Sequence, residues 1–167
     1  MMFLWIIALY ELFISIRRKF IRRRVYKMAL ERSKKTGLPL LVVGDPYNGL
    51  TSILTGCDYG CGDLTLDLTG CPKCPNGIKG YLEEVLPTLN VDHYIVFISC
   101  VLEYVNDVEL VTEHLSRMNS KNLFIVNVEW YSLTSRFYPY FLTSECPPRN
   151  VIYNCPPWSD TIEIKRL

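Results

Sequence analysis

The stretch that decides the fold is DHYIVFISCVLEYVNDVELVTEHLSRMNSKNLFIVNV, residues 92–128. Its first part, His93–Cys100, is rich in aromatic and β-branched residues, which is typical of a buried strand. The segment that follows has apolar residues at helical spacing: Val108, Val111, Leu115 and Met118. Either Asn106 or Asp107 can cap this helix at its start. Asn122–Val128 is a second buried run, so the stretch predicts strand, helix, strand.

Shorter apolar runs on either side extend the same pattern. Leu38–Val43 ends in Gly-Asp-Pro and fits a strand buried on both faces. Asp63–Leu68 is a second strand, and Gly77–Tyr81 is an ambiguous third. Two closing strands are expected at Val151–Asn154 and Thr161–Ile164. Strands that alternate with turns and helices predict an α/β fold with parallel crossovers.

Charge divides the chain into two parts. Residues 1–35 carry ten Lys/Arg and two Glu, a net charge of +8, whereas residues 36–167 carry a net charge of −7. We therefore expect an N-terminal helical segment, 1–35, and a globular domain, 36–167. Hydrophobic residues make up 49% and charged residues 21% of the 167 positions, which excludes a disordered or nucleic-acid-coating chain. No nucleic-acid partner is expected.

The N-terminal segment is apolar first and basic second. Met1–Ile16 reads MMFLWIIALYELFISI, and six of the eight residues in Arg17–Arg24 are basic. No Gly or Pro interrupts residues 3–34, so they can form one helix of about 48 Å. A short membrane anchor through residues 1–24, a transmembrane helix included, is the favoured interpretation. An amphipathic surface helix, a helix buried in a partner and a disordered basic tail are the alternatives.

At this point the residues resemble a family. Residues 92–128 resemble the fourth strand, following helix and fifth strand of class I S-adenosylmethionine-dependent methyltransferases. Asp92 with Val101–Asp107 is similar to the "FD…VLEH…D" signature of the small-molecule branch, and Gly62–Leu68 resembles its second strand. The resemblance covers about residues 38–130. It implies an α/β three-layer sandwich of the methyltransferase (Rossmann-like) type, with a mostly parallel sheet, preceded by the long N-terminal helix.

The resemblance also implies where S-adenosylmethionine would bind: Gly44, Asp45, Gly49, Asp67 and Ser99. Asp67 takes the place of the acidic residue that holds the ribose hydroxyls, and Ser99 ends the fourth strand. The first loop departs from the family's Gly-x-Gly-x-Gly pattern, because Pro46 stands at the middle glycine and supplies no N–H. Asp67 and the first loop also fit ordinary turns without a ligand. No catalytic residue is identified.

The seven cysteines allow several interpretations. A four-cysteine zinc site can in principle be formed by Cys57, Cys61, Cys71 and Cys74. An extended strand between the two pairs would span about 20 Å and is expected to hold them apart. Free thiols in a reducing compartment, or one or two disulfides, remain as alternatives.

Two functions are consistent with these features. The favoured one is a methyltransferase-like pseudoenzyme that serves as a membrane-attached structural subunit with protein partners. Its assembly would be large and membrane-containing, for example a virion or an organellar complex, with the domain on the cytoplasmic or equivalent side. The alternative is an active methyltransferase acting on a small molecule, a lipid or a membrane-near protein. An enzyme predicts an open cleft at Gly44–Gly49, Asp67 and Ser99, whereas a structural subunit predicts a cleft filled by residues such as Pro46, Tyr47 or the aromatic tail 138–157.

Overall fold

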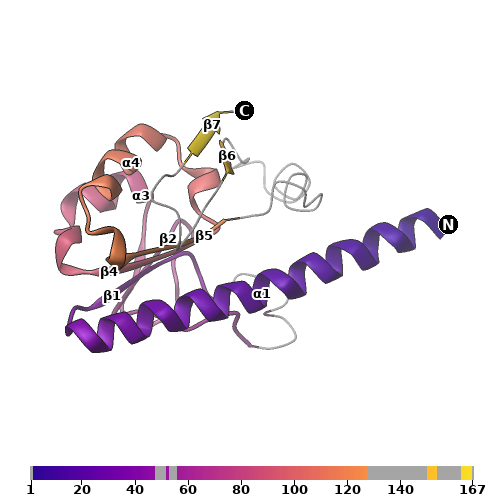
Figure 1. Ribbon diagram of the computed structural model, residues 1–167, viewed down its shortest axis with the longest axis horizontal. Helices are drawn as coiled ribbons and strands as arrows, with labels where there is room; N and C mark the ends of the chain where they lie inside the picture. Colours follow the sequence, from indigo (N-terminus) through magenta and orange to yellow (C-terminus); the bar gives the residue numbers. More distant parts are fainter. Residues whose placement is uncertain (1, 48–51, 53–55, 128–149, 154–162, 167) are drawn as a thin grey trace.

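A five-stranded, all-parallel sheet forms the centre of the protein (Figure 1). The computed structural model describes residues 2–47, 52, 56–127, 150–153 and 163–166. The strand order is β3-β2-β1-β4-β5, with β1 (Leu40–Val43), β2 (Leu64–Asp67), β3 (Gly77–Lys79), β4 (Ile95–Ser99) and β5 (Leu123–Val126). Each strand lies within a segment that the sequence predicts, so the α/β class is confirmed.

The sheet is buried on both faces, which explains its continuous apolar runs. In the central strand β1, Leu41 and Val43 belong to one hydrophobic cluster, while Leu40 and Val42 belong to a second. All four side chains are at most 1% exposed. Because neighbouring residues of a strand point to opposite faces, both faces of β1 need an apolar cover.

Helix α1 (Met2–Thr36) covers one face with its second half. Val25 and Ala29 are buried in the same cluster as Leu40 and Val42, and α1 contacts β1, β4 and β5. The chain turns from the end of α1 directly into β1, so α1 runs antiparallel to the strands. Its first half therefore extends past the carboxyl edge of the sheet, as Figure 1 shows.

The opposite face is covered by α3 (Leu82–Val85) and α4 (Val108–Ser116). Asp107 caps α4 by accepting a hydrogen bond of 3.0 Å from the Leu110 N–H, so Asp107 rather than Asn106 begins this helix. Four short 3-10 turns complete the described core: η1 (Leu86–Thr88), η2 (Val91–His93), η3 (Leu102–Tyr104) and η4 (Ser120–Asn122).

A separate antiparallel pair lies near the C-terminus. It consists of β6 (Asn150–Tyr153) and β7 (Glu163–Arg166). These are the two expected closing strands, the second displaced by two residues toward the C-terminus. Strand β6 lies beside η3, which follows the carboxyl end of β4. The aromatic tail 138–157 falls, apart from β6, outside the described residues.

No helix within the described residues is long and apolar enough to cross a membrane. The transmembrane helix expected near the N-terminus is therefore not found there.

Candidate functional site

The candidate site lies at the carboxyl edge of the sheet, where ligands of open α/β sheets bind. Gly44 follows β1 with a positive φ of 105°. A Cβ at this position would lie 2.7 Å from the Ser99 carbonyl oxygen and 3.1 Å from the Tyr59 hydroxyl. Glycine is thus required both by backbone conformation and by the close approach of its neighbours. The structure thus places Gly44 beside Ser99, two of the residues that the resemblance implies for a cofactor site.

Asp67 ends β2 and binds the loop that follows β1. Its Oδ2 accepts a hydrogen bond of 3.0 Å from the Asp45 N–H. Its Oδ1 accepts from the Thr69 N–H at 2.8 Å and from the Thr69 hydroxyl at 2.7 Å. Both carboxylate oxygens therefore already have donors from the protein. Asp45 in turn accepts from the Tyr47 N–H at 2.9 Å, while Gly49, the fifth predicted cofactor residue, lies outside the described residues.

Tyr59 fills the space between the β1 loop and α1. Its hydroxyl donates to the Gly44 carbonyl at 3.1 Å. Its ring packs edge-on against Phe97 of β4, with centroids 5.0 Å apart, and Tyr26 of α1 completes the group. The side chain is 5% exposed, and this burial raises the pKa of Tyr59. The phenol is therefore a neutral packing group that closes this side of the edge.

Basic residues of α1 hold the segment that carries Tyr59. Arg22 forms an ion pair of 3.0 Å with Asp58, and Lys19 lies 3.7 Å from the same carboxylate. Arg23 donates to the Asp58 carbonyl at 3.1 Å, and the Tyr26 hydroxyl donates to the Cys61 carbonyl at 2.8 Å. The basic run of the N-terminal segment thus closes one side of the sheet edge.

Cys100 directly follows β4 and has a positive φ of 54°, which is uncommon for a residue other than glycine. Its N–H donates to the Val126 carbonyl at 2.7 Å. Burial raises the pKa of the Cys100 thiol, while the charge of Arg22 acts in the opposite direction. A raised pKa disfavours the thiolate, so this thiol lacks the activation of a nucleophilic cysteine.

A cavity of about 40 Å³ lies on the other side of the edge. Its lining comes from the ends of β1 and β2, the start of α3 and the turn η3, with Asp67, Tyr81, Glu83 and Tyr104 among the residues. Pockets for drug-sized ligands have volumes of about 300–1,000 Å³. The cavity therefore has room for a few water molecules but is too small for a nucleoside.

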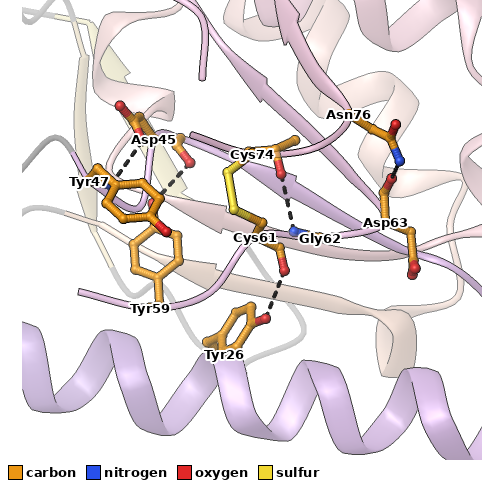
Figure 2. The surroundings of a disulfide bond; sticks show 11 residues. Tyr26, Asp45, Tyr47, Tyr59, Cys61, Gly62, Asp63, Cys74 and Asn76 are labelled. Atoms are coloured by element: carbon orange, nitrogen blue, oxygen red, sulfur yellow. Dashed lines mark hydrogen bonds between the residues drawn. A yellow bond between two sulfur atoms is a disulfide. The ribbon is translucent and has the colours of Figure 1, made fainter. Parts of the chain in front are cut away.

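The zinc hypothesis is not borne out, because Cys61 and Cys74 form a disulfide with Cα atoms 5.7 Å apart (Figure 2). Cys57 and Cys71 are free thiols, and no group suited to hold a metal ion occurs among the described residues. The expectation that an extended strand would separate the pairs was wrong. Strand β3 runs parallel to β2, so the chain must return to the amino edge after β2, and this return brings Cys74 back beside Cys61.

These contacts allow the fit of S-adenosylmethionine to be tested. The direction in which a Gly44 side chain would point is occupied by atoms of Ser99 and Tyr59, and the Asp67 oxygens are bound by Asp45 and Thr69. The adjoining cavity is several times smaller than a ligand pocket. Within the described residues, these contacts leave little space for this cofactor at the edge, and Gly49 lies outside them.

Two contributors to the edge were missed in the sequence: Tyr59 and the basic residues of α1. A signal for the second was present, because Ile21, Val25 and Ala29 recur every four residues from the basic run onward. That spacing indicates a helix face that packs on the domain. No comparable local signal exists for Tyr59.

Comparison with known proteins finds no matching family model, no similar curated protein and no similar solved structure.

Proposed function

We propose that this protein is a methyltransferase-like pseudoenzyme that serves as a membrane-attached structural subunit of a larger assembly. A membrane-containing viral particle or an organellar complex is the kind of assembly it suits. The fold proposed with it is the three-layer sandwich of the methyltransferase type. The strand order 3-2-1-4-5, with α1 on one face and α3 and α4 on the other, supports that part of the proposal.

The observation that carries the loss of catalysis is the position of Tyr59. Its hydroxyl donates a hydrogen bond to the Gly44 carbonyl and its ring packs against Phe97. Opening the space that Tyr59 fills would therefore disrupt the packing of buried aromatic side chains. Arg22, Arg23 and Tyr26 hold the segment that carries Tyr59. A ligand that displaced the Tyr59 side chain would have to break these contacts, and its binding free energy would be less favourable as a result. A filled edge is what a structural role predicts.

Structural attachment is supported by α1. Beyond the carboxyl edge its first half exposes large apolar side chains, among them Trp5, Leu9 and Phe13. Monomeric soluble proteins rarely expose contiguous apolar surface of this kind, which marks protein or membrane contact. The second half of α1 is part of the core, so the apolar end is firmly joined to the domain.

The test is calorimetric titration of S-adenosylmethionine and S-adenosylhomocysteine into the full chain. Residues 36–167 alone would lack Val25 and Ala29, and would expose one face of the sheet. We expect no heat of binding from a chain that still unfolds cooperatively. Micromolar binding, about −8 kcal/mol, that disappears in Asp67→Ala would overturn the pseudoenzyme.

The alternative, an active methyltransferase, is favoured by one observation. An acidic residue, Asp67, ends β2 beside a cavity between β2 and η3, which is where a nucleoside would lie in an enzyme of this type. The same titration decides between the two proposals, with Thr69→Val as a matched variant. Removing the Thr69 hydroxyl frees one position on Asp67, so an enzyme should retain cofactor binding in this variant.

A further inference from the structure

We propose that α1 lies flat on an anionic lipid surface through one face of its first half. This inference rests on the membrane attachment proposed above and specifies its geometry and its lipid. The face, called the outward stripe, consists of Trp5, Leu9, Phe13, Ile16 and Phe20.

The outward stripe follows from helical geometry. Its members are separated by four, four, three and four positions, which places them on one side of an α-helix. Four of them are among the most exposed apolar side chains of the described residues, at 63–67%: Trp5, Leu9, Phe13 and Phe20. The stripe extends over about 22 Å at 1.5 Å per residue.

The opposite side of the same helix is covered by the protein. Glu11 and Ile14 are 7% and 2% exposed, and further along the helix Val25 and Ala29 pack on the sheet. A helix that crosses a bilayer must give up such cover or bring it into the membrane. A helix that lies in the interface keeps it, because only one side meets lipid.

Charge identifies the lipid. Arg24 and Lys27 are exposed and continue the outward side of α1 beyond Phe20. Apolar side chains at one end and cations at the other match the acyl and headgroup layers of an anionic surface, where each basic residue adds attraction. Trp5 adds the aromatic side chain that is enriched at membrane interfaces.

A second copy of this chain is a less suitable occupant. A parallel pair of α1 helices would place Arg24 and Lys27 of one copy against the same residues of the other, and like charges that face each other across an interface repel. Lipid phosphates and carboxylates neutralise these cations instead.

The experiment is flotation of the full chain with vesicles of phosphatidylcholine alone, or with about a third phosphatidylserine. We expect flotation with the anionic vesicles, release by alkaline carbonate, and loss in Leu9→Glu/Phe13→Glu. The control Ala8→Glu adds a charge to an exposed site beside the stripe and should still float. Arg24→Gln/Lys27→Gln should lower partitioning about 30-fold, whereas Lys34→Gln/Lys35→Gln, equal in charge but at the far end of α1, should change it little.

Three outcomes would overturn this inference in different ways. Flotation that resists carbonate and is indifferent to the arginine and lysine variants would leave membrane attachment standing, but by insertion rather than on the surface. No flotation, with a dimer in analytical ultracentrifugation that Leu9→Glu/Phe13→Glu dissolves, would identify a second copy as the occupant. No flotation from a folded monomer would remove the membrane from the proposed function as well and assign the stripe to another protein. Circular dichroism of each variant verifies that α1 is intact.

Discussion

Arg22 and Asp58 form an ion pair of 3.0 Å between positions 36 apart in the sequence, and their side chains are only 13% and 3% exposed. The pair joins α1 to the segment that carries Tyr59. It therefore links the N-terminal helix to the closure of the sheet edge.

Removing the carboxylate of this pair should be strongly destabilising. Asp58→Ala removes the carboxylate that faces Arg22 and Lys19 and leaves these largely buried cations without it. Breaking a buried pair in this way lowers the free energy of unfolding by about 3–5 kcal/mol. The control is Glu113→Ala, which removes one partner of the exposed pair between Arg117 and Glu113 on α4 and should cost about 1 kcal/mol or less. Urea unfolding of the full chain measures both, and equal effects would mean that the Asp58 pair does not hold the helix.

Gly44→Ala should be more damaging than a glycine substitution in open space. The new Cβ would lie 2.7 Å from the Ser99 carbonyl oxygen and 3.1 Å from the Tyr59 hydroxyl, in addition to the cost of a positive φ. Gly37→Ala has a similar positive φ of 73° but meets nothing within 4 Å. We expect about 1–2 kcal/mol for Gly37→Ala and a clearly larger loss for Gly44→Ala. Thermal unfolding distinguishes them, and a smaller loss at Gly44 would contradict a filled edge.

The Cys61–Cys74 disulfide should stabilise the protein by constraining the unfolded chain. The two cysteines are 13 positions apart, and closing a loop of that size contributes about 3 kcal/mol in the chain-entropy treatment. Cys74→Ser should lower the urea midpoint of the oxidised protein, whereas Cys57→Ser, which removes a free thiol, should leave it unchanged. A reducing agent should lower the urea midpoint of the parent protein to that of Cys74→Ser and not below it. This result would show that the loss of stability in Cys74→Ser comes from the loss of the disulfide. Identical midpoints for parent and Cys74→Ser would exclude it.

Cys71 should make stability fall with pH in the alkaline range. Burial, with smaller contributions from Asp67 and Asp45, raises the pKa of this thiol from 9.0 to about 12. Below about pH 9 the Cys71 thiol keeps its proton in both the folded and the unfolded chain, so its ionisation does not reduce the free energy of unfolding. As the pH rises from about 9 to about 12, only the unfolded chain releases the proton, so folding becomes less favourable. Urea midpoints of the parent and Cys71→Ser should therefore converge with rising pH, and parallel curves would show that the thiol is not shielded.

Most of the described fold was predictable from the sequence, because it depends on local patterns. The five strands are apolar runs bounded by turn residues, and the α4 helix has a cap at Asp107 followed by Val108, Val111 and Leu115 at helical spacing. Asp45, Asp67 and Ser99 were chosen because the resemblance implies a site at the ends of the strands, and each of them follows or ends a parallel strand. These features need only a few neighbouring residues to be recognised.

The remainder depends on contacts between distant segments. Nothing near Tyr59 indicates that its hydroxyl will bind Gly44, and nothing near Asp58 indicates a partner on α1. The basic run that suggested a separate arm contains the residues that hold this edge, Arg22 and Arg23. One or two disulfides were among the alternatives, but the Cys61–Cys74 pairing was not identified. The length of β2 was considered without the return of the chain that leads to β3.

Helix α1 is continuous from Met2 to Thr36, without a Gly or Pro between the outward stripe and the part that packs on the sheet. The stripe is thus not at the end of a flexible tether. A surface bound by the outward stripe would therefore fix the orientation of the whole domain. The carboxyl edge of the sheet would face the stripe and the amino edge would face away from it. The helix is a rigid connection between the bound surface and the domain. Neighbouring copies on one surface would all have the same orientation and would present the same side to the next layer of an assembly.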